Sequence, residues 1–434
     1  MQVSEIVPFA AMRGHFLESE KGRLLAFRKR KKRIFRLWWS GPLQSKRSAT
    51  AAVNADFQKE VIKAMDSRGR RGPFTGPLML DALFSAGTRN APEVHALAKH
   101  YLDLLQWPVS GVKVPRKRIL VRDDAQIEFL SCGYDNPADN DGVYLRVRRL
   151  SDFAEDLELY NDLKSGTLDS EIDLSDRHRD ELEDDSAVES YYEFQRGKQN
   201  FIERFSQAAY HNMEFLYRRL AQEAILSNRR LGLRSIATLL RPRFDPMRRR
   251  PEMASIFDAG AQMTRWLYEQ PFMSVDFGAR AVRHGESKEF KERVREGLSR
   301  AKDRNPVIHL LLVPCGVTVL YLPPRHAEKI DLDNLMREAI IPSVHEILQP
   351  PATPRDFIVA VKTPDMDDRF AEMLEEYKRA PKFHVTGYQV MCIPRSASDP
   401  ESGNVRLVLH AGNAWRTAWQ ELESALEEWE QSID

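Results

Sequence analysis

The chain has 434 residues, enough for two or three domains, and 42% of them are hydrophobic, so sizeable cores are expected. Its 65 basic and 64 acidic residues leave a formal net charge of +1, which excludes a uniformly basic or acidic protein. Charge is nevertheless uneven, because residues 23–36 and 229–250 are basic and residues 152–193 are mostly acidic. Basic stretches of this kind are compatible with a nucleic-acid surface and equally with solvated helical faces.

The cysteines and the hydropathy pattern indicate the cellular setting. Cys132, Cys315 and Cys392 are widely spaced and form neither a disulfide framework nor a zinc-binding spacing, so we expect a reducing, cytoplasmic environment. No signal pattern stands at the N-terminus, and no apolar run approaches the ~20 residues of a membrane span. The most apolar stretch, residues 307–322, is interrupted by His309, a proline and a glycine, which favours a buried strand.

The first 150 residues alternate between strand and helix patterns. Apolar residues at helical spacing, such as Val53, Phe57 and Val61, predict a helix, and glycine–proline pairs after it predict turns. The expected order is strand, helix, strand, helix and a strand pair, which predicts an α/β unit over residues 1–150. The strands are expected at residues 34–39, 78–84, 118–133 and 143–149, and the helices at residues 49–65 and 92–105.

Residues 151–268 have a different character. The acidic stretch at residues 152–193 contains few aliphatic side chains and predicts an exposed linker or a loosely packed helical insert. Apolar spacing then predicts helices at residues 201–226 and 254–267.

From residue 269 to 411 the first order of elements recurs. Strands are expected at residues 272–279, 307–321, 384–393 and 405–410, with helices at 287–301 and 335–348, an insert at 357–379, and a tryptophan-bearing helix within residues 412–434. The closing hairpins align residues 125–130 with 388–393. A repeated order of elements indicates duplication, so we predict an α/β fold of two mixed-sheet units, arranged as a pseudo-dimer with a mainly helical insert between them.

A pair of carboxylates lies between the apolar stretch at residues 307–322 and the helix predicted at residues 335–348. Asp331 and Asp333 are one residue apart in this junction, so both can point at one hard cation, while the helix N-terminus offers N–H groups to a phosphate. Carboxylate oxygens suit Mg²⁺ or Mn²⁺. The alternative is that both aspartates only cap the helix.

These residues resemble motifs of the RusA family of Holliday-junction resolvases. That family carries Asp-x-Asp-Asn at a helix start, a lysine or similar base one turn on, and an Asp-Asp-x-Gln-Ile strand. The second unit has the first motif at residues 331–334, with Arg337 at the lysine position, and the first unit has the second motif at residues 123–127. The first unit keeps the helix lysine as Lys99. The first unit departs from the family where Asp-x-Asp reads Glu93-Val94-His95. The second unit departs from it where Thr386 and Gly387 align with Asp123 and Asp124.

The candidate ligands could form three alternative metal sites. In the first unit Glu93, His95 and Asp124 would be ligands, with Asp123 beside them and Lys99 on the scissile phosphate; this site has the more complete ligand set. In the second unit Asp331 and Asp333 would hold the metal, Arg337 the phosphate, and Asn334 a water. The third possibility is one composite site built from both units. The imidazole of His95 would shift metal preference towards Mn²⁺ or Zn²⁺. Without a metal role, Glu93 and His95 would be surface residues of a helix start, and Asp123 and Asp124 an ordinary turn.

The resemblance also implies a metal-dependent endonuclease that binds branched DNA, with one chain supplying both halves of the family's dimer. A catalytically degenerate DNA-binding or scaffold protein is the alternative, and further self-association or a protein partner stays open. We expect the nucleic acid to be bound by the N-terminal basic segment and its neighbours, with tryptophan stacking on bases: Arg30, Lys31, Lys32, Arg33, Trp38, Lys46 and Arg47.

Overall fold

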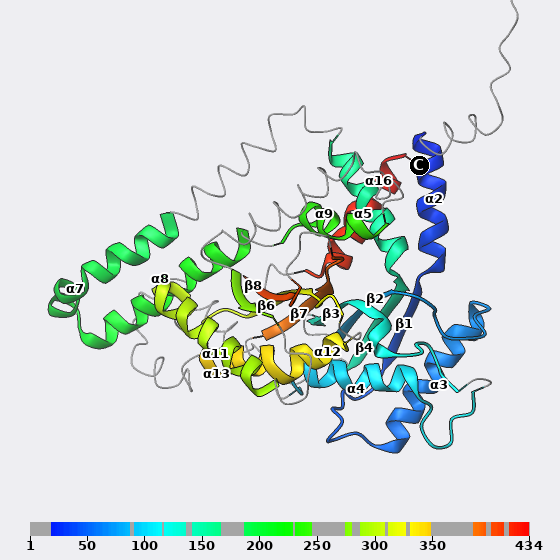
Figure 1. The fold of residues 1–434 in the computed structure, drawn as a ribbon. Coiled ribbons are helices and arrows are strands. Elements are labelled where there is room, and N and C mark those ends of the chain that lie inside the picture. Colours follow the sequence, from blue (N-terminus) through cyan, green and yellow to red (C-terminus); the bar gives the residue numbers. More distant parts are fainter. Residues whose placement is uncertain are drawn as a thin grey trace, which may run out of the picture.

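A single mixed sheet of eight strands organises the protein (Figure 1). The computed structural model describes residues 19–86, 91–114, 117–135, 141–165, 186–228, 231–244, 274–279, 287–308, 311–326, 330–348, 385–395, 401–411 and 416–433. The strand order across the sheet is β1-β4-β2-β3-β7-β6-β8-β5. The strands are β1 (Phe35–Ser40), β2 (Leu78–Ser85), β3 (Ile127–Asp135), β4 (Gly142–Arg149), β5 (Ser274–Gly278), β6 (Cys315–Leu322), β7 (Val385–Cys392) and β8 (Asn404–Ala411).

The first four strands form one half of the sheet and the last four form the other. Within the halves, β2 pairs with β3 and β6 with β7 in parallel, and the remaining pairs are antiparallel. The halves meet where β3 pairs antiparallel with β7. The predicted α/β class with a mixed sheet is therefore confirmed.

Two predicted strands are shorter than expected. β3 begins at Ile127, because a 3₁₀ turn, η1 (Asp124–Gln126), precedes it, and β6 begins at Cys315, well after the 3₁₀ turn η5 (Pro306–Ile308). In both segments apolar residues continue beyond the paired strand into buried loops, such as the one containing Leu120 and Val121. Apolar content alone therefore overestimated strand length.

Helices cover both faces of the sheet (Figure 1). One face carries α3 (Ala51–Ser67), α4 (Val94–Gln106), α11 (Ser287–Arg304) and a helix formed by α12 (Leu332–Leu335), the π-helical turn η6 (Met336–Ile340) and α13 (Ile341–Ile347). The other carries α2 (Glu20–Arg33), α5 (Leu150–Ser165), α9 (Leu233–Phe244) and α16 (Ala418–Ile433). The helices α7 (Lys198–Arg204) and α8 (Gln207–Asn228) extend to one side of this body.

The start of the acidic stretch is not the exposed linker that we predicted. In α5, Phe153 and Leu157 lie at i and i+4 and are fully buried against the sheet. Asp156 of the same helix is also buried and accepts hydrogen bonds from Arg30 and Arg148. The acidic composition did not predict this burial, because the inward-facing Asp156 is neutralised by arginines from other elements.

The predictions for the remaining insert have mixed outcomes. The predicted helix at 201–226 is divided between α7 and α8. The predicted helix at 254–267 and the insert at 357–379 lie outside the described residues. The three cysteines form no disulfide with one another, and none of the described helices has the length and apolar character needed to cross a bilayer.

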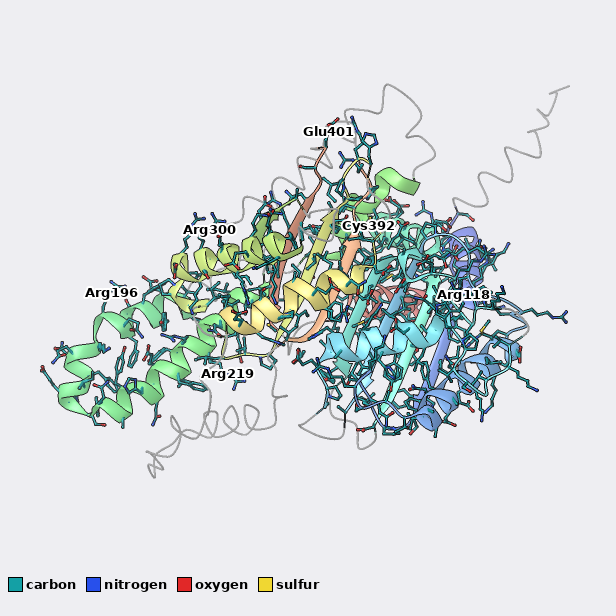
Figure 2. The ribbon with its side chains drawn as sticks, turned by 60° about the horizontal axis from the view of Figure 1, so that its bottom comes forward. Arg118, Arg196, Arg219, Arg300, Cys392 and Glu401 are labelled. Carbon is teal, nitrogen blue, oxygen red and sulfur yellow. The ribbon has the colours of Figure 1, made fainter. Side chains whose placement is uncertain are left out.

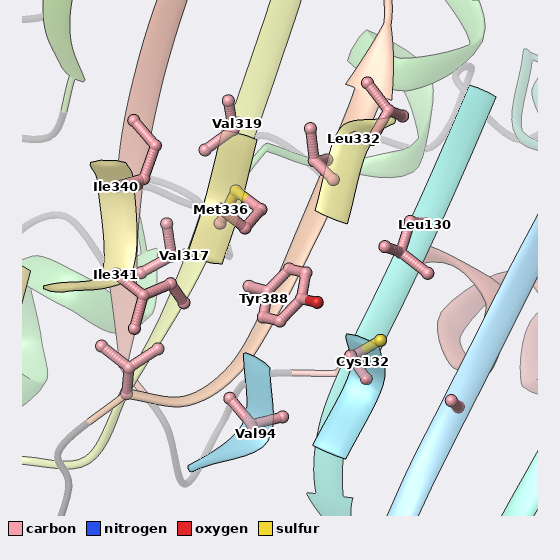
Figure 3. Close-up of a cluster of buried hydrophobic side chains, with 14 of the residues drawn as sticks. Val94, Leu130, Cys132, Val317, Val319, Leu332, Met336, Ile340, Ile341 and Tyr388 are labelled. Carbon is pink, nitrogen blue, oxygen red and sulfur yellow. The ribbon is translucent and has the colours of Figure 1, made fainter. Parts of the chain in front are cut away.

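The seam between the two halves is packed with apolar side chains (Figure 3). Leu130 and Cys132 of β3 lie beside Tyr388 of β7, and all three are essentially inaccessible to solvent. Leu332 and Met336, from α12 and η6, pack over this region. This burial fixes α12 above β3, a strand from the other half of the chain.

Candidate metal centre

Three aspartates from distant parts of the chain come together beside this seam. Asp123, Asp124 and Asp331 each offer a carboxylate oxygen, and these oxygens lie within 4.8 Å of one another. Asp123 caps η1 by accepting a hydrogen bond from the backbone N–H of Ala125, as expected for an ordinary turn. Asp331 is the N-cap residue of α12 but makes no capping bond with its side chain, so the capping alternative fails there.

Strand direction explains why these residues meet. β3 begins directly after Asp123 and Asp124, so both lie at the edge of the sheet where β3 starts. Because β7 runs antiparallel to β3, and β6 is parallel to β7, β6 ends at that same edge. The chain then leads from β6 to Asp331. The site is therefore the composite of both halves, the third of the possibilities considered from sequence.

Lys99 lies at the centre of this group of carboxylates. Its Nζ atom is 3.2 Å from Asp124 Oδ2, 3.2 Å from Asp333 Oδ2 and 3.1 Å from Asp103 Oδ1. Burial by itself would lower the pKa of Lys99, but the charges of Asp333, Asp103 and Asp124 raise it above its usual value. The ammonium therefore stays charged. Asp103, which sequence reasoning missed, was detectable as the i+4 neighbour of Lys99 in an amphipathic helix.

Asp333 is the most deeply buried carboxylate of the group, with 2% of its surface exposed. Burial raises its pKa, and the neighbouring Lys99 opposes that rise. A buried carboxylate is costly to desolvate, so Asp333 depends on its ion pair with Lys99.

The hydrogen bond between Asp124 and Asp331 requires a proton on one of the two carboxyl groups. Burial, the hydrogen bond with Asp124 and its negative charge raise the pKa of Asp331 to about 7. Burial also acts to raise the pKa of Asp124, but the hydrogen bond from Asp331 and the charge of Lys99 hold it below its usual value. Two carboxylates this close repel each other when both are ionised, and a cation between them would relieve that repulsion. A bound divalent cation would take the place of that proton.

The three ligand atoms fit a small divalent cation. Oxygens at about 2.1 Å from Mg²⁺ are at most about 4.2 Å apart, so the observed spacing requires only a small closure of the aspartates. Three carboxylate oxygens also leave positions for water and a phosphate oxygen. Oxygen ligands alone favour Mg²⁺ or Mn²⁺ over Zn²⁺.

Glu93 and His95 are not part of this centre, contrary to the first-unit site that we favoured. His95 Nδ1 lies 3.3 Å from Glu93 Oε2, and His345 Nδ1 lies 3.6 Å from the same oxygen. The cause is topological: Glu93 follows the end of β2, whereas Asp124 precedes the start of the parallel strand β3, so they stand at opposite edges of the sheet. Among the described residues no potential metal cluster includes either of them.

Burial determines the charge of His95. Burial lowers its pKa to about 4, and the nearby His345 and Arg337 act in the same direction against Glu93. The imidazole is therefore neutral at physiological pH.

Asn334 and Arg337 connect to the centre indirectly. Asn334 donates a hydrogen bond from Nδ2 to Asp331 Oδ2 at 3.0 Å, and Arg337 donates to Asn334 Oδ1 at 3.1 Å. Arg337 also pairs with Glu338. Asn334 thus orients a carboxylate in the described structure, where we expected it to orient a water.

Part of the predicted nucleic-acid surface is instead internal. Arg30 is 9% exposed and is held by Asp156 and Glu155, and Lys31 pairs with Glu427 and Glu430 of α16. The basic segment forms a helix with several faces, and these two side chains lie on the face that packs against acidic helices.

The other predicted residues are more accessible. Trp38 is 50% exposed, whereas its neighbour Trp39 is buried in the core. Lys32, Arg33 and Arg47 are exposed, and Lys46 pairs with Asp103 while remaining largely exposed. Arg33 lies 3.6 Å from Asp152.

Comparison with known proteins gives no match: no protein-family model, curated protein or solved structure is similar to this chain.

Proposed function

We propose that this protein is a metal-dependent nuclease that hydrolyses phosphodiester bonds in branched or structured DNA, related to the RusA resolvases. The observation that carries the proposal is the convergence of Asp123, Asp124 and Asp331 beside Lys99. These are the residues through which the two sequence motifs resemble the family. Their proximity in the fold is an observation independent of the motif resemblance that singled them out.

Each residue of the centre has a chemical part in this proposal. Asp123, Asp124 and Asp331 would hold Mg²⁺ or Mn²⁺, which when bound supplies Lewis acidity and lowers the pKa of a coordinated water. Asn334 orients Asp331, and Asp103 and Asp333 keep Lys99 protonated. An ammonium held beside the metal ligands would stabilise negative charge developing on the phosphate.

Strand register supports a duplicated, pseudo-dimeric origin for the two halves. Leu78 pairs with Ile127 and Cys315 with Val385, and in both cases an irregularity follows at the next position. This register equates Ile127 with Val385, whereas the alignment made from sequence equated it with Val390.

The central pairing obeys the same equivalence. Ser131 pairs with Gln389, which is its counterpart in the other half. Interchanging the two halves converts the neighbouring pair Leu130–Val390 into the pair Cys132–Tyr388. Glu93 and Asp331 are likewise the N-cap residues of α4 and α12. An approximate two-fold axis through the Ser131–Gln389 pair accounts for all these relations.

The same equivalence implies that a second site has been lost. The counterparts of Asp331, Asp333 and Lys99 are Glu93, His95 and Arg337. No potential metal cluster among the described residues includes Glu93 or His95, so the proposal includes one working centre per chain.

Cleavage of a labelled four-way junction tests the proposal. The wild-type chain should cut it with Mg²⁺ or Mn²⁺, and Asp124→Asn should cut at least 100-fold more slowly while binding the junction equally well. Asp66→Asn, an exposed change at the end of α3, is the matched control. Binding without cleavage under either metal would reject the nuclease and leave the DNA-binding alternative.

A further inference from the structure

A cleft lined by basic side chains opens between the end of α2 and the loop that joins α3 to β2. Its volume is about 510 Å³. The basic residues lining it are Lys32, Arg33, Arg68, Arg70 and Arg71, and none of the described residues that line it is acidic. We refer to it as the basic cleft.

The basic cleft and the aspartate centre lie along the same edge of the sheet. β1, β2 and β3 all run in one direction, so the segments that precede them stand at one edge. Lys32 and Arg33 precede β1, Arg68 to Arg71 precede β2, and Asp123 with Asp124 precede β3. Three strand spacings of about 4.8 Å separate β1 from β3, or roughly 14 Å.

Hydrogen bonds fix the loop of the basic cleft to the segment that carries the aspartates. The backbone N–H of Phe74 donates to Leu120 O at 2.8 Å, and Gln126 Nε2 donates to Gly76 O at 3.3 Å. Gln126 also belongs to the capping box of Asp123. The cleft and the candidate metal ligands are therefore parts of one structural unit.

Two of the guanidinium groups, those of Arg68 and Arg70, are held in place without an acidic partner among the described residues. Arg68 lies over the ring of Phe35, with 5.3 Å between guanidinium carbon and ring centroid, and donates to Arg36 O. Arg70 lies 3.6 Å above the ring of Phe74. Burial and neighbouring like charges, Arg36 and Arg149 respectively, lower the pKa of both arginines. This concentration of positive charge is unfavourable unless an anion neutralises it.

We propose that the basic cleft binds the phosphate backbone of a nucleic acid and leads it to the aspartate centre. The identity of the ligand rests on the proposed phosphodiester chemistry beside the cleft. Several guanidiniums at the same edge of the sheet as the aspartates match a chain of phosphates better than a single anion. The cleft also retains two of the residues expected to bind DNA, Lys32 and Arg33.

Charge reversal at two exposed positions of the cleft tests this assignment. The structure places neither Lys32 nor Arg71 in an ion pair with another described residue, so Lys32→Glu/Arg71→Glu should fold normally. Binding of a short fluorescein-labelled DNA duplex is measured by anisotropy in EDTA, where no cleavage occurs. We expect at least tenfold weaker binding at ~100 mM salt and a log–log salt slope about two units shallower.

A matched variant controls for net charge. Lys288 and Arg300 are exposed on α11, which belongs to the other half of the chain (Figure 2). Lys288→Glu/Arg300→Glu should change the affinity less than about twofold. Equal losses in both variants would mean general attraction of charge and would overturn the assignment, as would unchanged affinity of the cleft variant.

Two further measurements separate this inference from the proposed nuclease. If the cleft variant loses binding but the wild-type chain never cuts DNA with Mn²⁺, the cleft stands and the nuclease fails. If the wild-type chain cuts and the cleft variant binds and cuts equally well, the nuclease stands and the cleft fails. Selective loss of binding to phosphatidylserine vesicles, with DNA binding intact, would reassign the cleft to an anionic membrane surface and overturn the proposal.

Discussion

Lys99 Nζ lies 3.2 Å from Asp333 Oδ2, an ion pair that joins α4 of the first half to α12 of the second. The two side chains are 14% and 2% exposed, so both are largely removed from water. An ion pair in such surroundings depends strongly on both partners, because either charge alone would be left buried. The pair therefore couples the integrity of the aspartate centre to the packing of the two halves.

Lys99→Met should lower the free energy of unfolding by about 3 kcal/mol in EDTA, because Asp333 would lose its only described ion-pair partner. Chemical denaturation gives this quantity. Lys63→Met is the control: Lys63 is exposed and pairs only with Glu60, so its loss should cost less than about 0.5 kcal/mol. Adding Asp333→Asn to Lys99→Met should restore part of the loss. Equal stability of the Lys99 and Lys63 variants would contradict this account.

The pKa of Asp331, about 7, predicts that cation binding depends on pH. Below pH 7 a divalent cation must displace the proton of Asp331, so its apparent affinity should fall by up to about tenfold per pH unit. The rise in melting temperature on adding Mn²⁺ should therefore be larger at pH 8 than at pH 6. Asp331→Asn should remove the effect at both values. A Mn²⁺-induced rise that is the same at pH 6 and pH 8 would argue against a cation at this centre.

The metal-free protein should show the opposite trend at Asp331. Its folded-state pKa exceeds the ordinary aspartate value, so between about pH 4 and 7 the folded chain retains a proton that the unfolded chain has lost. The contribution of Asp331 to stability is present at the acid end of this window and is lost as pH rises through 7. His95 acts in the other direction, since its lowered pKa costs stability as pH falls from about 6.5 to 4. Comparing wild type with Asp331→Asn in EDTA isolates the aspartate.

Sequence patterns identified most of the residues of the centre but not how they combine. Asp331 and Asp333 were singled out from their spacing at a helix start, and Asp123, Asp124 and Lys99 from the resemblance to the RusA motifs, whereas Asp103 was missed. Their assembly depends on the antiparallel pairing of β3 with β7, a contact between residues more than 250 positions apart. Periodicity and capping signals are local, so they predict the strands and helices of each half without showing which edge of the sheet a distant carboxylate reaches.

The errors have the same origin. Glu93 and His95 were grouped with Asp124 because all belong to the first half, although parallel strands place a helix start and the next strand start at opposite edges. The acidic stretch was predicted to be an exposed linker or a loosely packed helical insert, because the arginines that neutralise Asp156 come from α2 and β4 and are not visible in its own composition. Composition describes a segment, whereas burial depends on its partners.

Arg30→Leu should destabilise the protein without weakening DNA binding. Arg30 donates to Asp156 Oδ1 at 2.6 Å and to Glu155 Oε2 at 3.0 Å, in a buried network that also contains Arg148. Because Arg148 still neutralises Asp156, we expect a loss of about 2 kcal/mol in unfolding free energy. Lys29→Leu, an exposed change on the same helix, should have little effect. Weaker duplex binding by folded Arg30→Leu would restore Arg30 to the nucleic-acid surface.

One working centre per chain predicts single-strand nicks. A nuclease with two equivalent sites cuts both strands of a junction in one encounter, whereas a chain with one centre must dissociate or reorient before a second cut. Incubation with a supercoiled plasmid carrying an extruded cruciform should therefore produce open-circular DNA first, with linear DNA appearing only as the open-circular form is consumed. Glu93→Gln, at the lost position, should leave the nicking rate within about twofold, whereas Asp331→Asn should abolish nicking.

Linear product formed directly from supercoiled plasmid at limiting enzyme would instead require a second active centre, either at the Glu93 position or in another copy of the chain. Measuring the rate of linear product against protein concentration separates these two sources, because a second copy gives a second-order dependence.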